Sequence, residues 1–280
     1  MMEEMLSPAS TLSPIHVPSQ AAHRPALAQG ALVPLAAHGI RVSWARHLDE
    51  VRQAQRLRYQ VFADEMGARL SGPLAGHDID LFDDYCEHLL VRDGDSDAVI
   101  GTYRVLTPAQ AARVGSFYAD LEFDLTRLRD LRSRMVELGR SCVHAEHRHG
   151  GVILALWGAL TQFMLRNQLD VMIGCASIPM QHQGLAAGQA AASIWRQLRA
   201  TSLAPLDCQV LPRLPLPVHR FDDSQDVEPP ALIRGYLRLG AKVLGAPAWD
   251  PDFNAAYLPM MMRTQDLPSR YRRHFAAAAS

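Results

Sequence analysis

A strongly apolar helix-like segment between two strand-like segments constrains the fold of this chain most. Residues 152–167 follow the glycine pair Gly150 and Gly151 and are mostly apolar. The strand-like segment Met135–Val143 precedes them, and a second apolar strand is expected at residues 169–175. Two strands joined through a helix usually lie parallel in one sheet. We expect this parallel pair to split beside the helix and to form a ligand cleft there.

The other segments predict how the sheet is completed. Alternating or β-branched runs indicate strands at Ile40–Trp44, 87–92, Val99–Leu106 and 257–263. Helical spacing indicates helices at residues 51–62, with Asp49 as N-cap, at 188–199 and at 230–239, the last ended by Gly240. Residues 66–86 are expected to form a loop, and the proline-rich residues 205–230 show no clear pattern. We therefore predict a fold of the α/β (α+β) class. It is expected to have a central, twisted mixed sheet that is flanked by helices.

Composition divides the chain near residue 38. Residues 1–38 are rich in Ala, Pro, Ser and His without periodicity, which predicts a flexible N-terminal tail, and residues 39–280 are expected to form a single domain. The N-terminus lacks the charged and apolar regions of a signal peptide. The longest apolar run is shorter than the roughly 20 residues that a membrane-spanning helix needs. These features predict a cytoplasmic protein.

Charge, cysteine content and histidine spacing argue against a nucleic-acid partner, a metal site and a disulfide framework. The net charge of −1 at pH 7 gives no general attraction to nucleic acid, so no nucleic-acid partner is expected. The four cysteines are far apart and make no CxxC pair, which argues against a zinc site or a disulfide framework. The histidines His144, His147 and His149 do not have the spacing of a zinc motif, and we expect no metal site.

Charged residues inside two of the apolar strands are the main sign of chemistry. Arg104 lies within Val99–Leu106, and Glu137 and Arg140 lie within Met135–Val143. Residues three apart on a regular strand point to opposite faces, so Glu137 and Arg140 share a surface only if a bulge near Gly139 intervenes. Buried charges are costly unless they are paired or needed. A structural salt-bridge network and an active site both remain open.

Two further motifs suit charged ligands. Asp78, Asp80, Asp83 and Asp84 form an acidic run that could bind an ammonium group or a cation, or could be a solvated loop; its spacing is not that of an EF-hand. Arg148, followed by the Gly150 and Gly151 pair, directly precedes the apolar helix. Exposed N–H groups at such a helix start suit a pyrophosphate or a pantetheine amide.

Four of these segments, taken in order, resemble a known family. Arg58-Tyr59-Gln60-Val61-Phe62, Asp80-Leu81-Phe82-Asp83, residues 101–106 and Glu137-Leu138-Gly139-Arg140 resemble the signature of acyl-homoserine-lactone synthases and of the related ornithine-lipid N-acyltransferases. Residues 229–242 and 249–253 are closer to the second group, and residues 64–68 lack the tryptophan usual in the first. Residues 178–183 differ from the Phe-Pro-Gly-Thr type expected in the ornithine group. The resemblance covers about residues 40–275 and implies a GNAT-like acyl-CoA N-acyltransferase fold.

The resemblance also implies an activity and roles for individual residues. The expected reaction transfers a (3-hydroxy)acyl group from acyl carrier protein to the α-amine of L-ornithine, giving lyso-ornithine lipid in the first step of ornithine lipid biosynthesis. The carrier's phosphopantetheine thioester is the co-substrate, and no cofactor is implied. The expected catalytic residues are Glu137, which is the candidate general base, Arg140 and Arg104. Substrate binding is expected at Arg58, Phe62, Asp80 and Asp83, and pantetheine binding at Arg148, Gly150 and Gly151.

Two basic segments are candidates for contact with partners. An acidic carrier protein needs a basic surface, which Arg127, Arg129, Arg132 and Arg134 would offer unless they form only a solvated polar segment. The cationic run at Arg270, Arg272 and Arg273 could contact the carrier or, peripherally, the inner membrane. Two alternative functions remain: acyl-homoserine-lactone (autoinducer) synthesis from S-adenosylmethionine, and non-catalytic lipid binding of a haemolysin-like kind.

Overall fold

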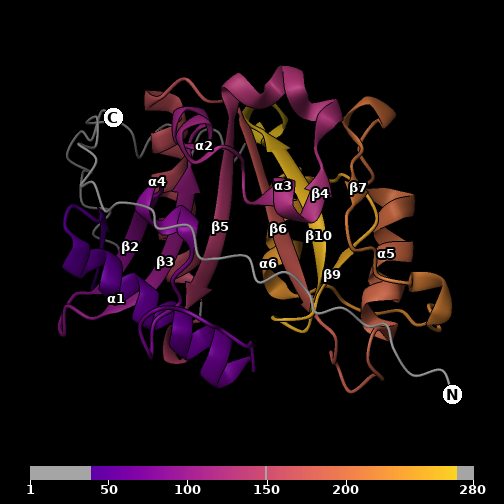
Figure 1. Cartoon of the computed structure of the whole chain (residues 1–280), viewed down its shortest axis with the longest axis horizontal. Coiled ribbons are helices and arrows are strands. Elements are labelled where there is room, and N and C mark those ends of the chain that lie inside the picture. The colour runs from indigo at the N-terminus through magenta and orange to yellow at the C-terminus, as the bar shows by residue number, and fades with distance from the viewer. Residues whose placement is uncertain (1–38, 149, 270–280) are drawn as a thin grey trace, which may run out of the picture.

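One mixed sheet organises the computed structural model, which describes residues 39–148 and 150–269 (Figure 1). Its eight strands follow the order β1-β2-β3-β5-β6-β10-β8, and β9 pairs with β10 outside this path. The strands are β1 Ile40–Trp44, β2 Glu87–Asp93, β3 Val99–Leu106, β5 Met135–Val143, β6 Val171–Pro179, β8 Lys242–Val243, β9 Ala248–Asp250 and β10 Ala255–Arg263. A separate pair joins β4 Phe123–Asp124 to β7 Leu211–Pro212. The predicted mixed sheet with flanking helices is confirmed.

The parallel pair in the middle of the sheet is only partly joined. Strands β5 and β6 are linked by α4 Gly151–Arg166 and pair from Met135 opposite Val171 to Glu137 opposite Ile173. Beyond Glu137 the two strands have no ladder pairs, although each continues for several residues. The expected split of the parallel pair beside the apolar helix is therefore present.

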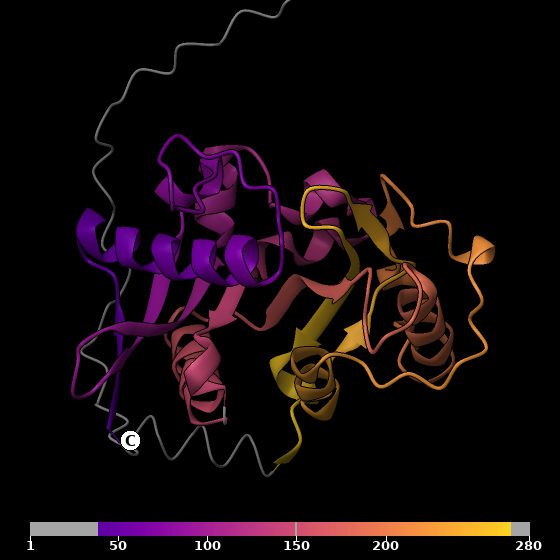
Figure 2. The same cartoon turned by 90° about the horizontal axis from the view of Figure 1, so that it is seen from below.

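Helices cover both faces of the sheet (Figure 2). On one side, here called the α4 face, α4 packs on β2, β3 and β5, while α5 Gln189–Thr201 and α6 Ala231–Arg238 pack on β6 and β10. On the other side, the α1 face, lie α1 Leu48–Tyr59, α2 Pro108–Val114, α3 Ala119–Glu122 and the 3₁₀ segment Thr126–Arg134. Side chains alternate between these faces along each strand, so the core has two layers.

Several local predictions need correction. The N-cap of α1 is His47, and Asp49 lies in the first turn of the helix. The helix then continues as a π-helical stretch, Gln60–Glu65, and the expected loop at residues 66–86 contains a 3₁₀ turn, Leu81–Asp84. Helix α2 was not predicted, although Thr107 and Gln110 form a capping box around it. Gly240, at φ 90°, follows α6 as expected.

Some expectations concern parts of the chain outside the described residues. These are the flexible tail at residues 1–38 and the cationic run at Arg270, Arg272 and Arg273. Within residues 39–148 and 150–269, no helix combines the length and the apolar character needed to cross a membrane.

The close approach of β5 and β6 at Gly174 gives a stability prediction. A Cβ at Gly174 would lie 2.5 Å from the backbone oxygen of Leu138, so Gly174→Ala must force the strands apart. We expect the free energy of unfolding to fall by about 1–3 kcal/mol in urea denaturation. Gly139→Ala is the matched control, because its Cβ would meet no atom within 4 Å. Equal losses in the two variants would contradict this account.

Candidate functional site

A β-bulge in β5 brings Glu137 and Arg140 to the same surface. In the ladder between β3 and β5, Thr102 lies opposite Cys142 but Arg104 lies opposite Gly139. Two residues of β5 therefore oppose one residue of β3, which reverses the facing of the side chains beyond that point. Arg140 itself has φ 49°, a left-handed conformation that is uncommon for a residue other than glycine. A bulge near Gly139, the condition under which Glu137 and Arg140 could share a surface, is therefore present.

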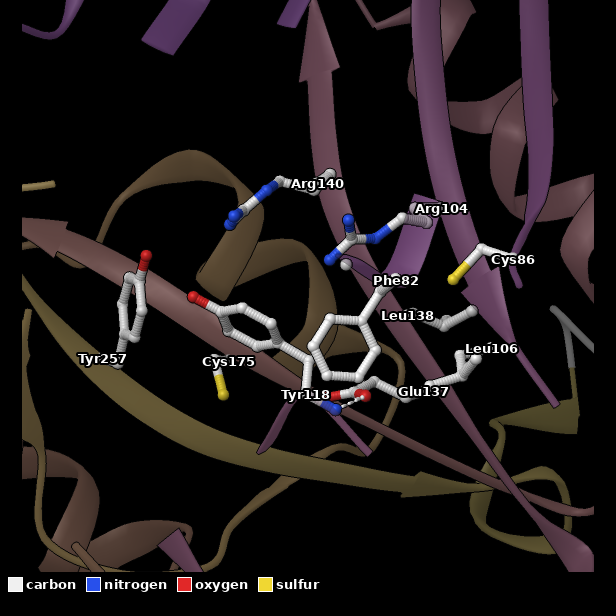
Figure 3. Close-up of a pocket in the computed structure, with 11 residues that line it drawn as sticks. Phe82, Cys86, Arg104, Leu106, Tyr118, Glu137, Leu138, Arg140, Cys175 and Tyr257 are labelled. Atoms are coloured by element: carbon white, nitrogen blue, oxygen red, sulfur yellow. Dashed lines mark hydrogen bonds between the residues drawn. The ribbon is translucent and has the colours of Figure 1, made fainter. Parts of the chain in front are cut away.

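A small cavity of about 40 Å³ lies beside this bulge on the α1 face, and we call it the bulge cavity (Figure 3). Glu137, Arg104 and Arg140 contribute its charged groups, and the rings of Phe82, Tyr118 and Tyr257 form much of its wall. The expected catalytic residues Glu137, Arg140 and Arg104 therefore line one cavity.

A second cavity lies on the α4 face, at the place where β5 and β6 part, and we call it the apolar cavity. Its lining comes from β6, β10 and α6 and is largely aliphatic. Leu138 and Cys175 line both this cavity and the bulge cavity. The two cavities thus lie back to back on opposite faces of the sheet. A ligand in the apolar cavity can present one end at the gap between the strands, next to Glu137.

Glu137 is held in a defined position with a perturbed pKa. Its side chain is buried, and its two oxygens accept hydrogen bonds from the backbone N–H groups of Tyr118, at 2.6 Å, and Ala119, at 2.7 Å. Burial raises the pKa of Glu137 to about 7, although these two hydrogen bonds and the charge of Arg104 favour the ionised form. Each carboxylate oxygen keeps a second lone pair, so Glu137 can still accept a proton near neutral pH.

Three arginines and three aspartates form a closed network behind the bulge cavity. Arg58 contacts Asp78 and Asp83, both at 2.7 Å. Arg104 contacts Asp80 at 2.5 Å and Asp83 at 3.1 Å. Arg140 contacts Asp78 at 3.2 Å and Asp80 at 3.1 Å. Each arginine therefore meets two aspartates and each aspartate two arginines, so the formal charges cancel.

The network fixes the ionisation and the exposure of its aspartates. Burial alone would raise the pKa of Asp83, but Arg58 and Arg104 hold it well below its usual range. The pKa of Asp80 is lowered in the same way, mainly by Arg104. Asp83 is only 4% exposed and accepts hydrogen bonds from Gln55, Arg58 and Arg104. The salt bridges of the structural interpretation are thus present for Arg104 and Arg140 but do not include Glu137, and Asp83 serves to hold arginines.

The other residues expected to bind substrate lie behind the cavity wall or at its edge. Arg58 is fully buried within the network. Phe62 packs edge-on against Phe253, with ring centroids 5.6 Å apart, and does not line the bulge cavity. Asp80, whose side chain is 23% exposed, remains within reach of a ligand.

The residues expected to bind pantetheine lie together at the start of α4. Gly150 is the N-cap, with φ 99°, and Gly151 is the first helical residue. Arg148 donates to the carbonyl of Val143 at 3.0 Å and pairs with Glu65 at 2.6 Å. The glycine pair thus begins the helix as predicted, while His149 is outside the described residues.

One group of side chains in the described part of the chain has the composition of a metal site. Ligand atoms of His144, Glu146 and His147 lie within 4.8 Å of one another on the surface before α4. The spacing of the histidines in the sequence predicts that no metal binds there, and the absence of a metal site stays a prediction.

Sequence patterns missed several residues around the bulge cavity. Tyr118 and Glu122 lie at α3, a four-residue helix too short to show periodicity. Tyr257 and Asp250 come from β10 and β9 at the far end of the chain. Of these residues, only Asp250 lies in a motif that the resemblance had singled out, residues 249–253.

Comparisons with known proteins agree with this geometry. Residues 57–158 match the acetyltransferase (GNAT) domain family. An L-ornithine N(alpha)-acyltransferase of Rhodobacter capsulatus is 36% identical over 245 residues, which cover 82% of this chain and 92% of that protein. The protein of the same name from Brucella abortus is 32% identical over 82% of this chain and 86% of its own length. The solved structure of a CoA-dependent acyl-homoserine lactone synthase shares the fold, with a TM-score of 0.51 at 16% identity over 86% of this chain and 90% of that one.

The closed network predicts a large effect of removing one charge. Asp83→Asn would leave Arg58 and Arg104 short of a buried counter-charge, and we expect a loss of about 3–5 kcal/mol in the free energy of unfolding. The matched control is Asp97→Asn, because Asp97 pairs with Arg41 where both side chains are more than half exposed. That change should cost less than about 1 kcal/mol. Similar urea midpoints for both variants would show that the network does not stabilise the fold.

Proposed function

This chain belongs to the L-ornithine N(alpha)-acyltransferase family, and we propose that it transfers an acyl group from acyl carrier protein to the α-amine of L-ornithine. The observation that carries the proposal is the back-to-back arrangement of the apolar cavity and the bulge cavity at Leu138 and Cys175. A thioester entering from the α4 face and an amine entering from the α1 face would meet next to Glu137. The product would be an N-acylornithine, the lyso form of an ornithine lipid.

The apolar cavity suits the acyl chain of the donor. Met172, Ala176, Met260 and Met262 contribute apolar side chains to it, and burying an acyl chain against them is favourable. The N-terminus of α4, with Gly150 and Gly151, offers backbone N–H groups to the pantetheine arm. Because β5 has no ladder with β6 beyond Glu137, its backbone N–H groups on that side are available to stabilise an oxyanion.

The bulge cavity suits the amine and the carboxylate of the acceptor. An α-ammonium is not nucleophilic until it loses a proton, and Glu137 is placed to accept that proton. The neutral nitrogen then attacks the thioester carbonyl carbon. As the C–S bond breaks, the nitrogen loses its second proton and the released thiolate takes up that proton, while Glu137 returns the first proton to solvent. Arg104 and Arg140 line the same cavity and suit the acceptor's carboxylate.

The position of the arginine run supports a carrier-docking site elsewhere. Arg129, Arg132 and Arg134 lie within ion-pair distance of Asp130, Asp120 and Asp170, as Arg148 does of Glu65, so ion pairing does not separate the two candidate sites. Their segment, Thr126–Arg134, precedes β5, whereas α4 follows it, and the nine-residue strand between them spans about 30 Å. We therefore place the carrier near Arg148 and the start of α4.

A direct assay tests the proposed function. Purified protein, 3-hydroxyacyl carrier protein and L-ornithine should release free pantetheine thiol and give an amide with the mass of N-acylornithine. Absence of thiol release with ornithine and with other amino acids would refute acyl transfer. A lactone formed from S-adenosylmethionine would instead show an autoinducer synthase.

The base role of Glu137 predicts the pH dependence. The carboxylate must be ionised to accept a proton, so kcat/KM should rise as pH increases through about 7 and then level off. Glu137→Gln should remove this rise and lower turnover by about 10²–10⁴-fold. Glu87→Gln is the control, because Glu87 is a buried glutamate that does not line the cavity. Near-normal turnover in a folded Glu137→Gln protein would give Glu137 a structural role.

A further inference from the structure

A larger cleft of about 390 Å³ opens next to the bulge cavity, and we call it the outer cleft. Tyr118 and Arg140 line both spaces, so the outer cleft is adjacent to the bulge cavity. The bulge cavity, at about 40 Å³, has room for the reacting end of an amino acid and little more. The rest of the acceptor must therefore extend into the outer cleft.

Two carboxylates in the outer cleft have no cationic partner. Glu122, from α3, and Asp250, from β9, both line it. Among the described residues, no arginine, lysine or histidine lies within the 4.0 Å ion-pair distance of either carboxylate. Asp250 is more than nine-tenths buried, and its Oδ1 accepts hydrogen bonds from the backbone N–H groups of Asp252, at 2.8 Å, and Phe253, at 2.9 Å. Its carboxylate is thus held in the cleft wall by hydrogen bonds and has no ion-pair partner among the described residues.

Arg69, Arg140 and Arg213 also line the outer cleft, but within the described residues none of them lies within ion-pair distance of Glu122 or Asp250. Burial and the charge of Asp250 raise the pKa of Glu122, and Arg140 offsets this only in part. The contrast with the network is direct, because Asp78, Asp80 and Asp83 each meet two arginines. The carboxylates first expected to bind an ammonium group are already neutralised, whereas Glu122 and Asp250 are not.

We propose that Glu122 and Asp250 bind the side-chain ammonium group of the acceptor and thereby select a diamino acid over a neutral amino acid. This inference rests on the proposed function. With its α-amine at Glu137 and its carboxylate at Arg104 and Arg140, an extended diamino acid points its side chain into the outer cleft. There its ammonium group can pair with both carboxylates, and the ring of Trp249, which also lines the cleft, favours a cation nearby.

The test compares L-ornithine with L-norvaline, which has the same carbon chain without the side-chain ammonium. Wild-type protein should favour ornithine strongly in kcat/KM. Glu122→Gln should lower that preference by about 10- to 100-fold, the range expected when a charge-assisted hydrogen bond is lost. The change should appear mainly in the KM for ornithine, while the values for norvaline and for the acyl donor stay the same. Asp95→Asn, in the turn between β2 and β3, makes the same change in net charge away from the cleft and should have no effect.

Each arm of this experiment decides a separate question. The wild-type protein with ornithine tests the proposed function, because acyl transfer to ornithine must occur for that function to stand. Equal wild-type efficiency with ornithine and norvaline would overturn the ammonium subsite while leaving acyl transfer intact. An unchanged preference in Glu122→Gln, or an equal loss for both acceptors, would also overturn the inference and give Glu122 a structural role.

Discussion

The ring of three arginines and three aspartates behind the bulge cavity is the interaction on which the site depends. It joins α1 through Arg58, β3 through Arg104 and β5 through Arg140 to the segment that carries Asp78, Asp80 and Asp83. Isolated charges at this depth would each be unfavourable by several kcal/mol, so each segment is held in place by the need to complete the ring. The left-handed conformation of Arg140 fits this account, because its guanidinium group is fixed by two aspartates and lies over the rings of Tyr118 and Phe253.

The parting of β5 and β6 gives the sheet a passage between its faces. A continuous parallel ladder would seal the α4 face from the α1 face, but the ladder ends at Glu137 and the bulge follows within three residues. The same short stretch of β5 therefore supplies the base, the gap and the arginine. Apolar side chains line one side of the gap and charged side chains the other, which matches a reaction between a lipid thioester and a polar amine.

Much of this arrangement could be predicted from the sequence, and there is a physical reason why the rest could not. Strands β3 and β5 have the predicted bounds, since apolar alternation is a local property. The sequence showed only that Glu137 and Arg140 could share a face if a bulge lay between them, and the bulge itself appears in the pairing of β3 with β5. The sequence showed the charges of the network but not their pairing, because Arg58 and Asp83 are 25 residues apart and meet only in the folded chain. Glu122 and Asp250 could not be recognised for the same reason, since they lie on different short elements and have no periodic pattern. Helix α2 is different, because its capping box at Thr107 was visible in the sequence.

The neutrality of the network also explains how a base can operate beside two arginines. An unpaired guanidinium group at this depth would favour the ionised form of Glu137 and leave it a weak base. Because Asp80 and Asp83 compensate Arg104, and Asp78 and Asp80 compensate Arg140, burial outweighs the remaining attraction and the pKa of Glu137 lies at about 7. The aspartates thus keep the arginines in place for a carboxylate without suppressing the basicity of Glu137. Arg140, held by Asp78 and Asp80, only partly offsets the raised pKa of Glu122, so a cationic ligand can still pair with Glu122 and Asp250.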